Sequence, residues 1–212
     1  GGWISSDYSK RFAFDLSSNL RLFGEEGRYR HNIDFSPRFR VNDKILLTAY
    51  GGRFFWPNDV GFVNYDGDSI ILGKRDNVTF EGLVQANYTP NVKMSFGLRL
   101  RHYWSFAEYS AFYNLGDDGS LLPTTYNSFD AVGNSIDDVN FNAFNVDFVY
   151  TWFFAPGSEL NIVWKNSIYQ FGTYLPENYL DDMDQVFDAP VGNNFSIKLL
   201  YYLDYLYLKK KQ

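Results

Sequence analysis

Residues 93–104 read Lys-Met-Ser-Phe-Gly-Leu-Arg-Leu-Arg-His-Tyr-Trp, and their polarity alternates with a period of two. The apolar positions include Met94 and Leu98, which fall on one side of the alternation. The basic positions Arg99 and Arg101 fall on the other side. Successive side chains of a β-strand point to opposite faces of a sheet. This stretch therefore predicts one strand with an apolar face and a charged face.

The same alternation recurs along the chain and predicts eight strands. They span residues 11–23, 28–41, 45–56, 77–88, 93–104, 141–154, 159–171 and 194–207. Strands of about twelve residues reach roughly 40 Å, enough to cross a hydrocarbon core when tilted. Strands of soluble domains are usually about half as long. We therefore expect an all-β fold, an antiparallel transmembrane β-barrel, with 1–212 as one domain or as the C-terminal part of a larger barrel.

The connections between these strands alternate in length. The chain turns sharply at Asn42, Pro90 and Pro156. Long outer loops are predicted near residues 57–76, 106–140 and 172–193. Short turns on one side and long loops on the other are typical of outer-membrane barrels. This arrangement favours a multi-pass protein of the bacterial outer membrane, with its long loops outside the cell.

Three tryptophans lie near the ends of predicted strands. Trp56 and Trp104 precede long loops, and Trp152 lies close to a short turn. Tryptophan is enriched where a membrane protein crosses the membrane–water interface. These residues are candidates for an interface aromatic girdle. The alternative is that they are core aromatics of a soluble β-sandwich.

Basic side chains concentrate on the predicted faces opposite the apolar ones. The candidates for a basic lumen lining are Arg28, Arg30, Arg38, Arg40, Arg53, Arg99 and Arg101. Fewer acids share those faces, namely Asp15, Asp34, Glu81, Asp147 and Asp204. Unpaired arginines inside a dry barrel would cost much desolvation energy, so we expect a wet lumen or a larger barrel. A solvated, partly ion-paired lining without a ligand is an alternative to a specific anion site.

Several kinds of chemistry find little support in the sequence. There is no cysteine, which excludes disulfides and thiolate metal sites. No phosphate-binding glycine loop or zinc spacing is present, and the basic residues follow strands, so we expect no cofactor and no nucleic-acid partner. His31 and His102 fall on the apolar face, where a general base for luminal chemistry is poorly placed.

Acidic residues in the long loops are weak candidates for a metal site. They are Asp117, Asp118, Asp181, Asp182 and Asp184. Carboxylate oxygens are suitable ligands for Ca²⁺, but the spacing matches no recognised calcium loop. Solvated loop charge is the alternative interpretation.

Five stretches taken together resemble a known family. They are GGWISSDY at 1–8, WPNDVG at 56–61, LRLRHYW at 98–104, FAPGSEL at 154–160 and LLYYLDY at 199–205. The set is similar to the C-terminal β-barrel domain of unknown function that follows a carbohydrate-binding-family-nine-like domain in outer-membrane proteins. The resemblance implies that upstream barrel strands and a periplasmic domain belong to the same polypeptide. It supplies no catalytic residues. The chain also starts without an initiator Met or signal peptide, so we expect a mature or cut portion.

These observations favour a non-enzymatic function. We expect an outer-membrane β-barrel that acts as a transport conduit, or as a membrane anchor or scaffold for a protein partner, in contact with outer-membrane lipid. One alternative is an outer-membrane hydrolase with Ser and Asp residues at the loop mouth. The other is a soluble β-sandwich carbohydrate-binding module.

Overall fold

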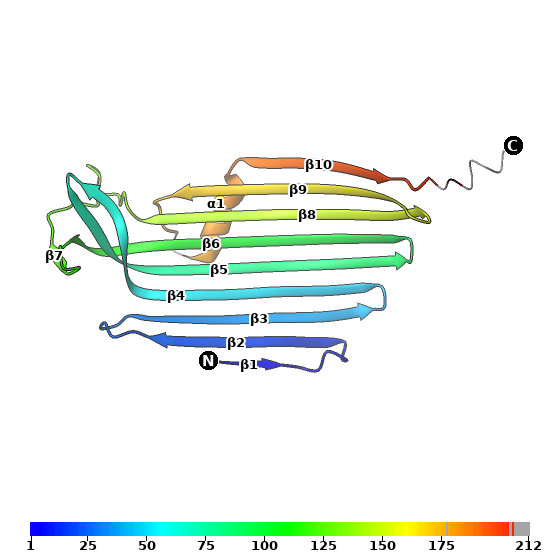
Figure 1. The fold of residues 1–212 in the computed structure, drawn as a ribbon, viewed down its shortest axis with the longest axis horizontal. Helices are drawn as coiled ribbons and strands as arrows, with labels where there is room; N and C mark the ends of the chain where they lie inside the picture. The colour runs from blue at the N-terminus through cyan, green and yellow to red at the C-terminus, as the bar shows by residue number, and fades with distance from the viewer. Residues whose placement is uncertain (177, 204, 206–212) are drawn as a thin grey trace.

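One antiparallel sheet makes up most of the computed structural model, which describes residues 1–176, 178–203 and 205 (Figure 1). Its strands are β1 (Gly2–Ser5), β2 (Phe12–Leu22), β3 (Tyr29–Asn42), β4 (Ile45–Asp66), β5 (Ser69–Asn91), β6 (Met94–Leu115), β7 (Leu121–Pro123), β8 (Val139–Ala155), β9 (Ser158–Gly172) and β10 (Val191–Leu200). One helix, α1 (Tyr179–Asp188), lies between β9 and β10 in sequence. The strands neighbour one another in chain order, except that β7 pairs with β6 beside the main path.

The sheet is open within the described residues. β1 pairs with β2 alone, and β10 pairs with β9 alone. The prediction of an all-β antiparallel fold is confirmed, whereas the described residues do not close into a barrel. Each edge strand keeps a row of backbone N–H and C=O groups that a further strand could pair with.

Tight turns join the strands at one end of the sheet, as the sequence predicts. The side-chain oxygen of Asn42 accepts hydrogen bonds from the backbone N–H groups of Lys44 (2.9 Å) and Ile45 (2.9 Å). Asn91 accepts one from Lys93 in the same way (2.8 Å). Gly157 adopts a positive φ of 71° between β8 and β9. Such side chain-to-backbone bonds and positive φ angles are the usual chemistry of hairpin turns.

The predicted loop at 57–76 is wrong, because β4 and β5 continue through it as a hairpin. The pairing shifts between Trp56 and Asp59, where Asn58 has a φ of 54°. This bulge interrupts the two-residue alternation, so the sequence pattern predicts the end of the strand at residue 56. The hairpin then closes at Gly67, whose φ is 59°. A bulge of this kind bends a strand without ending it.

The other two predicted loops also contain regular structure. Residues 106–115 extend β6, and the short β7 folds back on them. Residues 179–188 form α1, which the strand alternation did not predict. Asn178 caps this helix, because its side-chain oxygen accepts hydrogen bonds from the backbone N–H groups of Leu180 and Asp181. Caps of this type satisfy backbone donors that a helix start otherwise leaves free.

The ends of the chain differ from the predicted strands. The last strand is predicted at 194–207, and β10 spans Val191–Leu200. Residues 204, 206 and 207 of that prediction, including Asp204, lie outside the described residues. At the other end, Gly2–Ser5 forms β1, which was not predicted.

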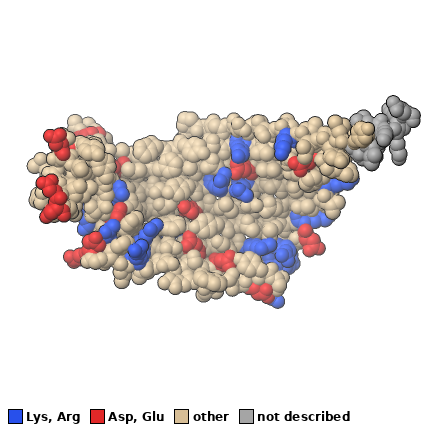
Figure 2. Space-filling view, viewed as in Figure 1, with Lys and Arg blue, Asp and Glu red and all other residues tan. Residues whose placement is uncertain are grey.

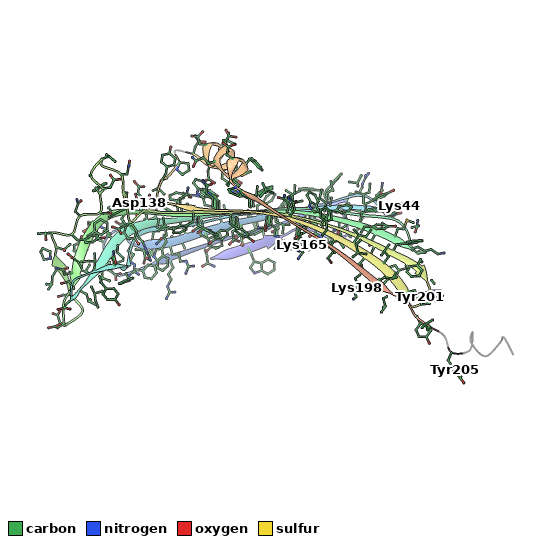
Figure 3. All side chains as sticks on the ribbon, turned by 90° about the horizontal axis from the view of Figure 1, so that it is seen from above. Lys44, Asp138, Lys165, Lys198, Tyr201 and Tyr205 are labelled. Atoms are coloured by element: carbon green, nitrogen blue, oxygen red, sulfur yellow. The ribbon has the colours of Figure 1, made fainter. Side chains whose placement is uncertain are left out.

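Cross-strand pairing divides the side chains between two faces. The apolar face carries pairs such as Leu98 with Phe148 and Trp164 with Phe195. We call the opposite side, which includes Arg99 and Lys165, the charged face. Figure 3 shows α1 on one side of the sheet and Lys198 on the other. No helix in the described part of the chain has the length and apolar content needed to cross a membrane.

Candidate functional site

The charged face gathers six of the seven arginines predicted to form a lining. They are Arg28, Arg30, Arg38, Arg40, Arg99 and Arg101. Figure 2 looks onto this face and shows Lys and Arg in clusters over the strands. Asp and Glu gather at the left end of this view, which is the end of the β4–β5 hairpin and β7 in Figure 1. The turn residues Asp66, Asp68, Asp117 and Asp118 belong to these segments. The separation of basic strands from acidic tips follows the sequence pattern.

The centre of the charged face holds one carboxylate among three cations. Asp147 lies in register with Arg99 on β6 and with Lys165 on β9. Arg101 donates a hydrogen bond from Nη2 to Oδ2 of Asp147 at 2.6 Å. The local charge is therefore positive. The Arg101 side chain is 47% exposed, so much of its charge meets solvent.

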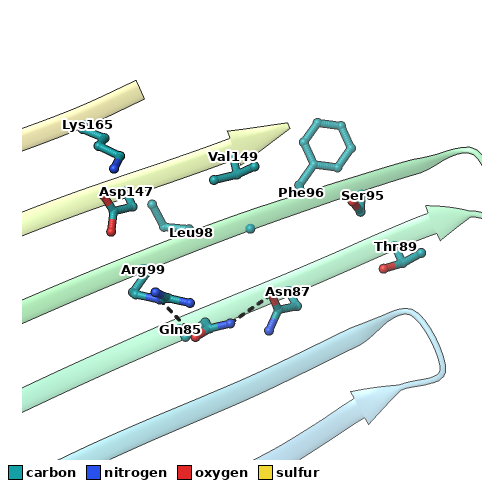
Figure 4. Close-up of a pocket in the computed structure, with 11 residues that line it drawn as sticks. Gln85, Asn87, Thr89, Ser95, Phe96, Leu98, Arg99, Asp147, Val149 and Lys165 are labelled. Carbon is teal, nitrogen blue, oxygen red and sulfur yellow. Dashed lines mark hydrogen bonds between the residues drawn. The ribbon is translucent and has the colours of Figure 1, made fainter. Parts of the chain in front are cut away.

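A hollow of about 420 Å³ adjoins this cluster (Figure 4). Gln85 accepts a hydrogen bond from Nε of Arg99 at 3.3 Å and donates one to Asn87 at 3.2 Å. Ser95 and Lys165 also line the hollow. Amide and guanidinium donors of this kind suit a hydrated anion or polar groups of a solute.

A second basic cluster surrounds Trp56 at the long-loop end of the charged face. The guanidinium groups of Arg28 and Arg30 lie 5.8 Å and 5.0 Å from the Trp56 ring, which also stacks on Phe23. Arg28 also forms an ion pair with the buried Asp59 at 3.1 Å. Trp56 thus lies among arginines, on the opposite face from Trp104.

Arg38 and Arg40 occupy the short-turn end of the charged face. Arg38 pairs with Ala13 and Thr48 and lies over the Tyr8 ring at 5.6 Å. Arg40 pairs with Leu46, just before the pairing shifts. Both are separated along the strands from the hollow beside Arg99.

The seventh predicted lining residue, Arg53, lies on the apolar face instead. It pairs with Ile33 on β3 and with Phe80 on β5, and both belong to that face. Strand β4 has apolar side chains at both parities, at residues 45–47 and 54–56, so the sequence leaves its orientation ambiguous. The guanidinium lies 5.0 Å from the Phe55 ring and 5.6 Å from the Phe80 ring.

The tryptophans of the apolar face have different surroundings. Trp104 is 3% exposed, stacks on Phe80 at 5.2 Å, and donates a hydrogen bond to Asn140 at 2.8 Å. It lies beneath α1, close to Tyr179. Trp152 is 37% exposed, near the short turn between β8 and β9. Of the two, Trp152 has the exposure that an interface residue needs.

A polar cluster is buried between α1 and the sheet. Asp182 is fully buried and accepts a hydrogen bond from Asn142 at 2.7 Å. His102 contacts Asn142 through Nε2 and the Tyr179 hydroxyl through Nδ1, at 3.3 Å and 2.7 Å. Oδ2 of Asp182 has no hydrogen-bond partner within the described chain. Burial raises the pKa of the Asp182 carboxyl above its usual value, although the Asn142 bond opposes that shift.

The candidate metal ligands are not brought together. Asp182 points into the sheet, whereas Asp181 and Asp184 are exposed. Asp118 caps its own turn by accepting a hydrogen bond from the backbone N–H of Ser120 at 3.0 Å. No group of three or more His, Cys, Asp or Glu residues within 1–176, 178–203 and 205 could hold a metal ion.

His31 has a serine within hydrogen-bonding distance. Its Nε2 lies 3.1 Å from Oγ of Ser18, on the apolar face between β2 and β3. In the described chain no carboxylate or amide contacts the other ring nitrogen. The pair is thus two members of a nucleophile–base–orienter arrangement, without the third.

Neither α1 nor the cluster beneath it was predicted from the sequence. An Asn followed by acids in the first turn, with Tyr179, Asp182 and Val186 at helical spacing, is a recognisable helix signal.

No curated protein and no solved structure matches the chain. A family model matches residues 1–212, and the chain therefore belongs to the family described as Domain of unknown function (DUF5916).

Proposed function

We propose that this chain is part of an outer-membrane β-barrel whose charged face lines a water-filled conduit and whose apolar face contacts lipid. The distribution of side chains over one and the same set of strands carries this proposal. On the apolar face, Val84 is 54%, Leu98 is 38% and Phe195 is 73% exposed. A lone sheet in water would leave these groups unfavourably hydrated, whereas a bilayer would cover them.

The open edges support a larger assembly. β10 is exposed along its whole length, and β1 and β10 both have an unpaired side. Further strands of the same polypeptide are the partners we propose for these edges, because lipid cannot satisfy backbone hydrogen bonds. A periplasmic domain on that polypeptide would use the barrel as its anchor.

Flotation and conductance measurements test the proposal. The chain is refolded with liposomes, floated through a density gradient and then examined in planar bilayers. We expect co-flotation and anion-preferring conductance, because the centre of the charged face is positive. Protein that stays at the bottom of the gradient would contradict the membrane location. Flotation without conductance would restrict the function to anchoring.

A lipid-facing hydrolase is the second candidate, and the Ser18–His31 contact favours it. Ser18→Ala would abolish hydrolysis of a phospholipid or p-nitrophenyl ester if this pair were catalytic. The absence of wild-type hydrolysis would reject this candidate. A β-sandwich needs a second sheet packed on the first, and the described residues form one sheet.

A further inference from the structure

Arg53 lies on the apolar face, in the same cross-strand row as Phe80 and Trp104. From the short turns up to and including this row, it is the one charged residue (Lys, Arg, Asp or Glu) on the apolar face of the described strands β2–β9. Its side chain is exposed, and its contacts among the described residues are with the Phe55 and Phe80 rings, without a hydrogen bond or ion pair. A lone charge facing lipid is costly unless it meets a partner of opposite sign. Its position therefore calls for an anionic group that the described residues do not supply.

A groove of about 470 Å³ begins at Arg53 on the same face. Gly51 and Gly82, which pair with each other, form part of its floor. A Cβ at Gly51 would meet nothing within 4 Å, so the groove is open above the backbone there. The groove is therefore open because Gly51 and Gly82 carry no side chains.

The walls of this groove are aromatic and apolar. Phe35 lines one side, and Phe80 and the ring of Tyr179 from α1 line the other. Apart from the Arg53 guanidinium and Glu81, whose side chain belongs to the charged face, its lining is suited to hydrocarbon. A cation at one end of an apolar groove matches a molecule with an anionic head and an apolar tail.

We propose that this groove binds one anionic membrane lipid, with its phosphate on Arg53 and an acyl chain between Phe35 and Phe80. The inference rests on the proposed membrane location, because that location brings lipid to this face. A free phosphate would use only the arginine and would leave the groove walls in contact with water.

Spin-labelled lipids test this site in liposomes that contain the full chain. The probes are phosphatidylglycerol and phosphatidylcholine, each with a nitroxide on an acyl chain. The measurement is the fraction of each lipid whose motion the protein restricts. We expect wild type to prefer phosphatidylglycerol by roughly fivefold, the effect of one basic side chain near a membrane surface.

Four variants separate the parts of the site. Arg53→Gln should remove the preference, and Arg53→Lys should keep most of it. Gly51→Leu should weaken binding of both lipids at the groove by filling it. Arg21→Gln removes the same charge from the charged face and should leave the preference unchanged.

The outcomes distinguish the site from the proposed function. If wild type fails to float with liposomes, the proposed function fails and the lipid site fails with it. If wild type floats and Arg53→Gln keeps the full preference, the lipid site alone is overturned. Inorganic phosphate that abolishes the preference would overturn the acyl-chain part, because a phosphate ion cannot fill the groove.

Discussion

Two regions of the apolar face share one alternation and have opposite surroundings. Beneath α1, Trp104 is 3% exposed and Asp182 is fully buried. Towards the short turns, Leu98 is 38% exposed, and on the neighbouring strand Val84 is 54% exposed. Helix α1 covers the first region, and the described residues leave the second uncovered. We propose that lipid covers this second region.

The largest expected effect lies under α1. Trp104→Ala should destabilise the protein by about 3–5 kcal/mol, because it opens a cavity and leaves Asn140 without its donor. Chemical denaturation in detergent measures the loss. Trp152→Ala is the matched control, since Trp152 is 37% exposed and should cost less. Equal losses from the two variants would contradict the tight packing of α1.

A charge placed in the uncovered region should have the next largest effect. Leu98→Arg should cost about 2–4 kcal/mol in a bilayer, the depth-dependent penalty for arginine on a lipid-facing strand position. Val149→Arg is a closely matched control, because Val149 is 36% exposed on the charged face of the adjacent strand. Urea unfolding of the liposome-bound protein measures the change in unfolding free energy for both variants. A penalty at Val149 as large as that at Leu98 would mean that the two faces are not different.

The cluster beneath α1 should respond to pH. Because burial raises the pKa of Asp182 in the folded protein, the folded state binds the proton more tightly than the unfolded state. Docking of α1 should therefore be strongest at low pH and weaken as pH rises through that raised pKa. Between the ordinary pKa of the carboxyl and its raised pKa, the docking equilibrium should fall by up to about tenfold per pH unit. Amide hydrogen exchange of α1 across this range is the measurement.

Asp182→Asn is the control for this pH effect. The groups that face Asp182 are Asn140, Asn142 and His102 from the sheet, with Tyr179 on its own helix. If the variant keeps the pH dependence of wild type, Asp182 is not the group whose titration controls docking of α1.

The smallest effect on stability is expected on the charged face. Asp147→Asn removes a partly exposed ion pair with Arg101 and should cost about 0.2–1 kcal/mol. The same change removes the one carboxylate among Arg99, Arg101 and Lys165, so anion preference should increase. Reversal potentials in a salt gradient measure that preference. An unchanged reversal potential would mean that this cluster does not line the conduit.

Local alternation was sufficient to predict much of the sheet. Polar and apolar side chains alternate cleanly in residues 93–104, and the first half of β6 and its orientation were predicted correctly, although the strand continues to Leu115. The alternation failed where both parities are apolar, which put Arg53 on the wrong face. It also failed at Pro57 and Asn58, where a bulge ends the pattern but not the strand.

The site beneath α1 could not be predicted from alternation because it depends on contacts distant in sequence. Asp182 meets Asn142 and His102 only when the helix folds back over β6 and β8. The four acids of α1 look like solvated loop charge until the cap at Asn178 is recognised. The charged cluster at Asp147 was more accessible, since its members alternate along neighbouring strands.

The central claim is that the two faces of these strands meet different solvents. The chain has no cysteine, so single nitroxide labels can be attached at Leu98→Cys and Val149→Cys. Collisions with oxygen, which is concentrated in lipid, are then compared with collisions with a water-soluble nickel chelate. We predict that oxygen dominates at position 98 and the chelate at position 149. Equal access of the chelate to both labels in liposome-bound protein would contradict the account.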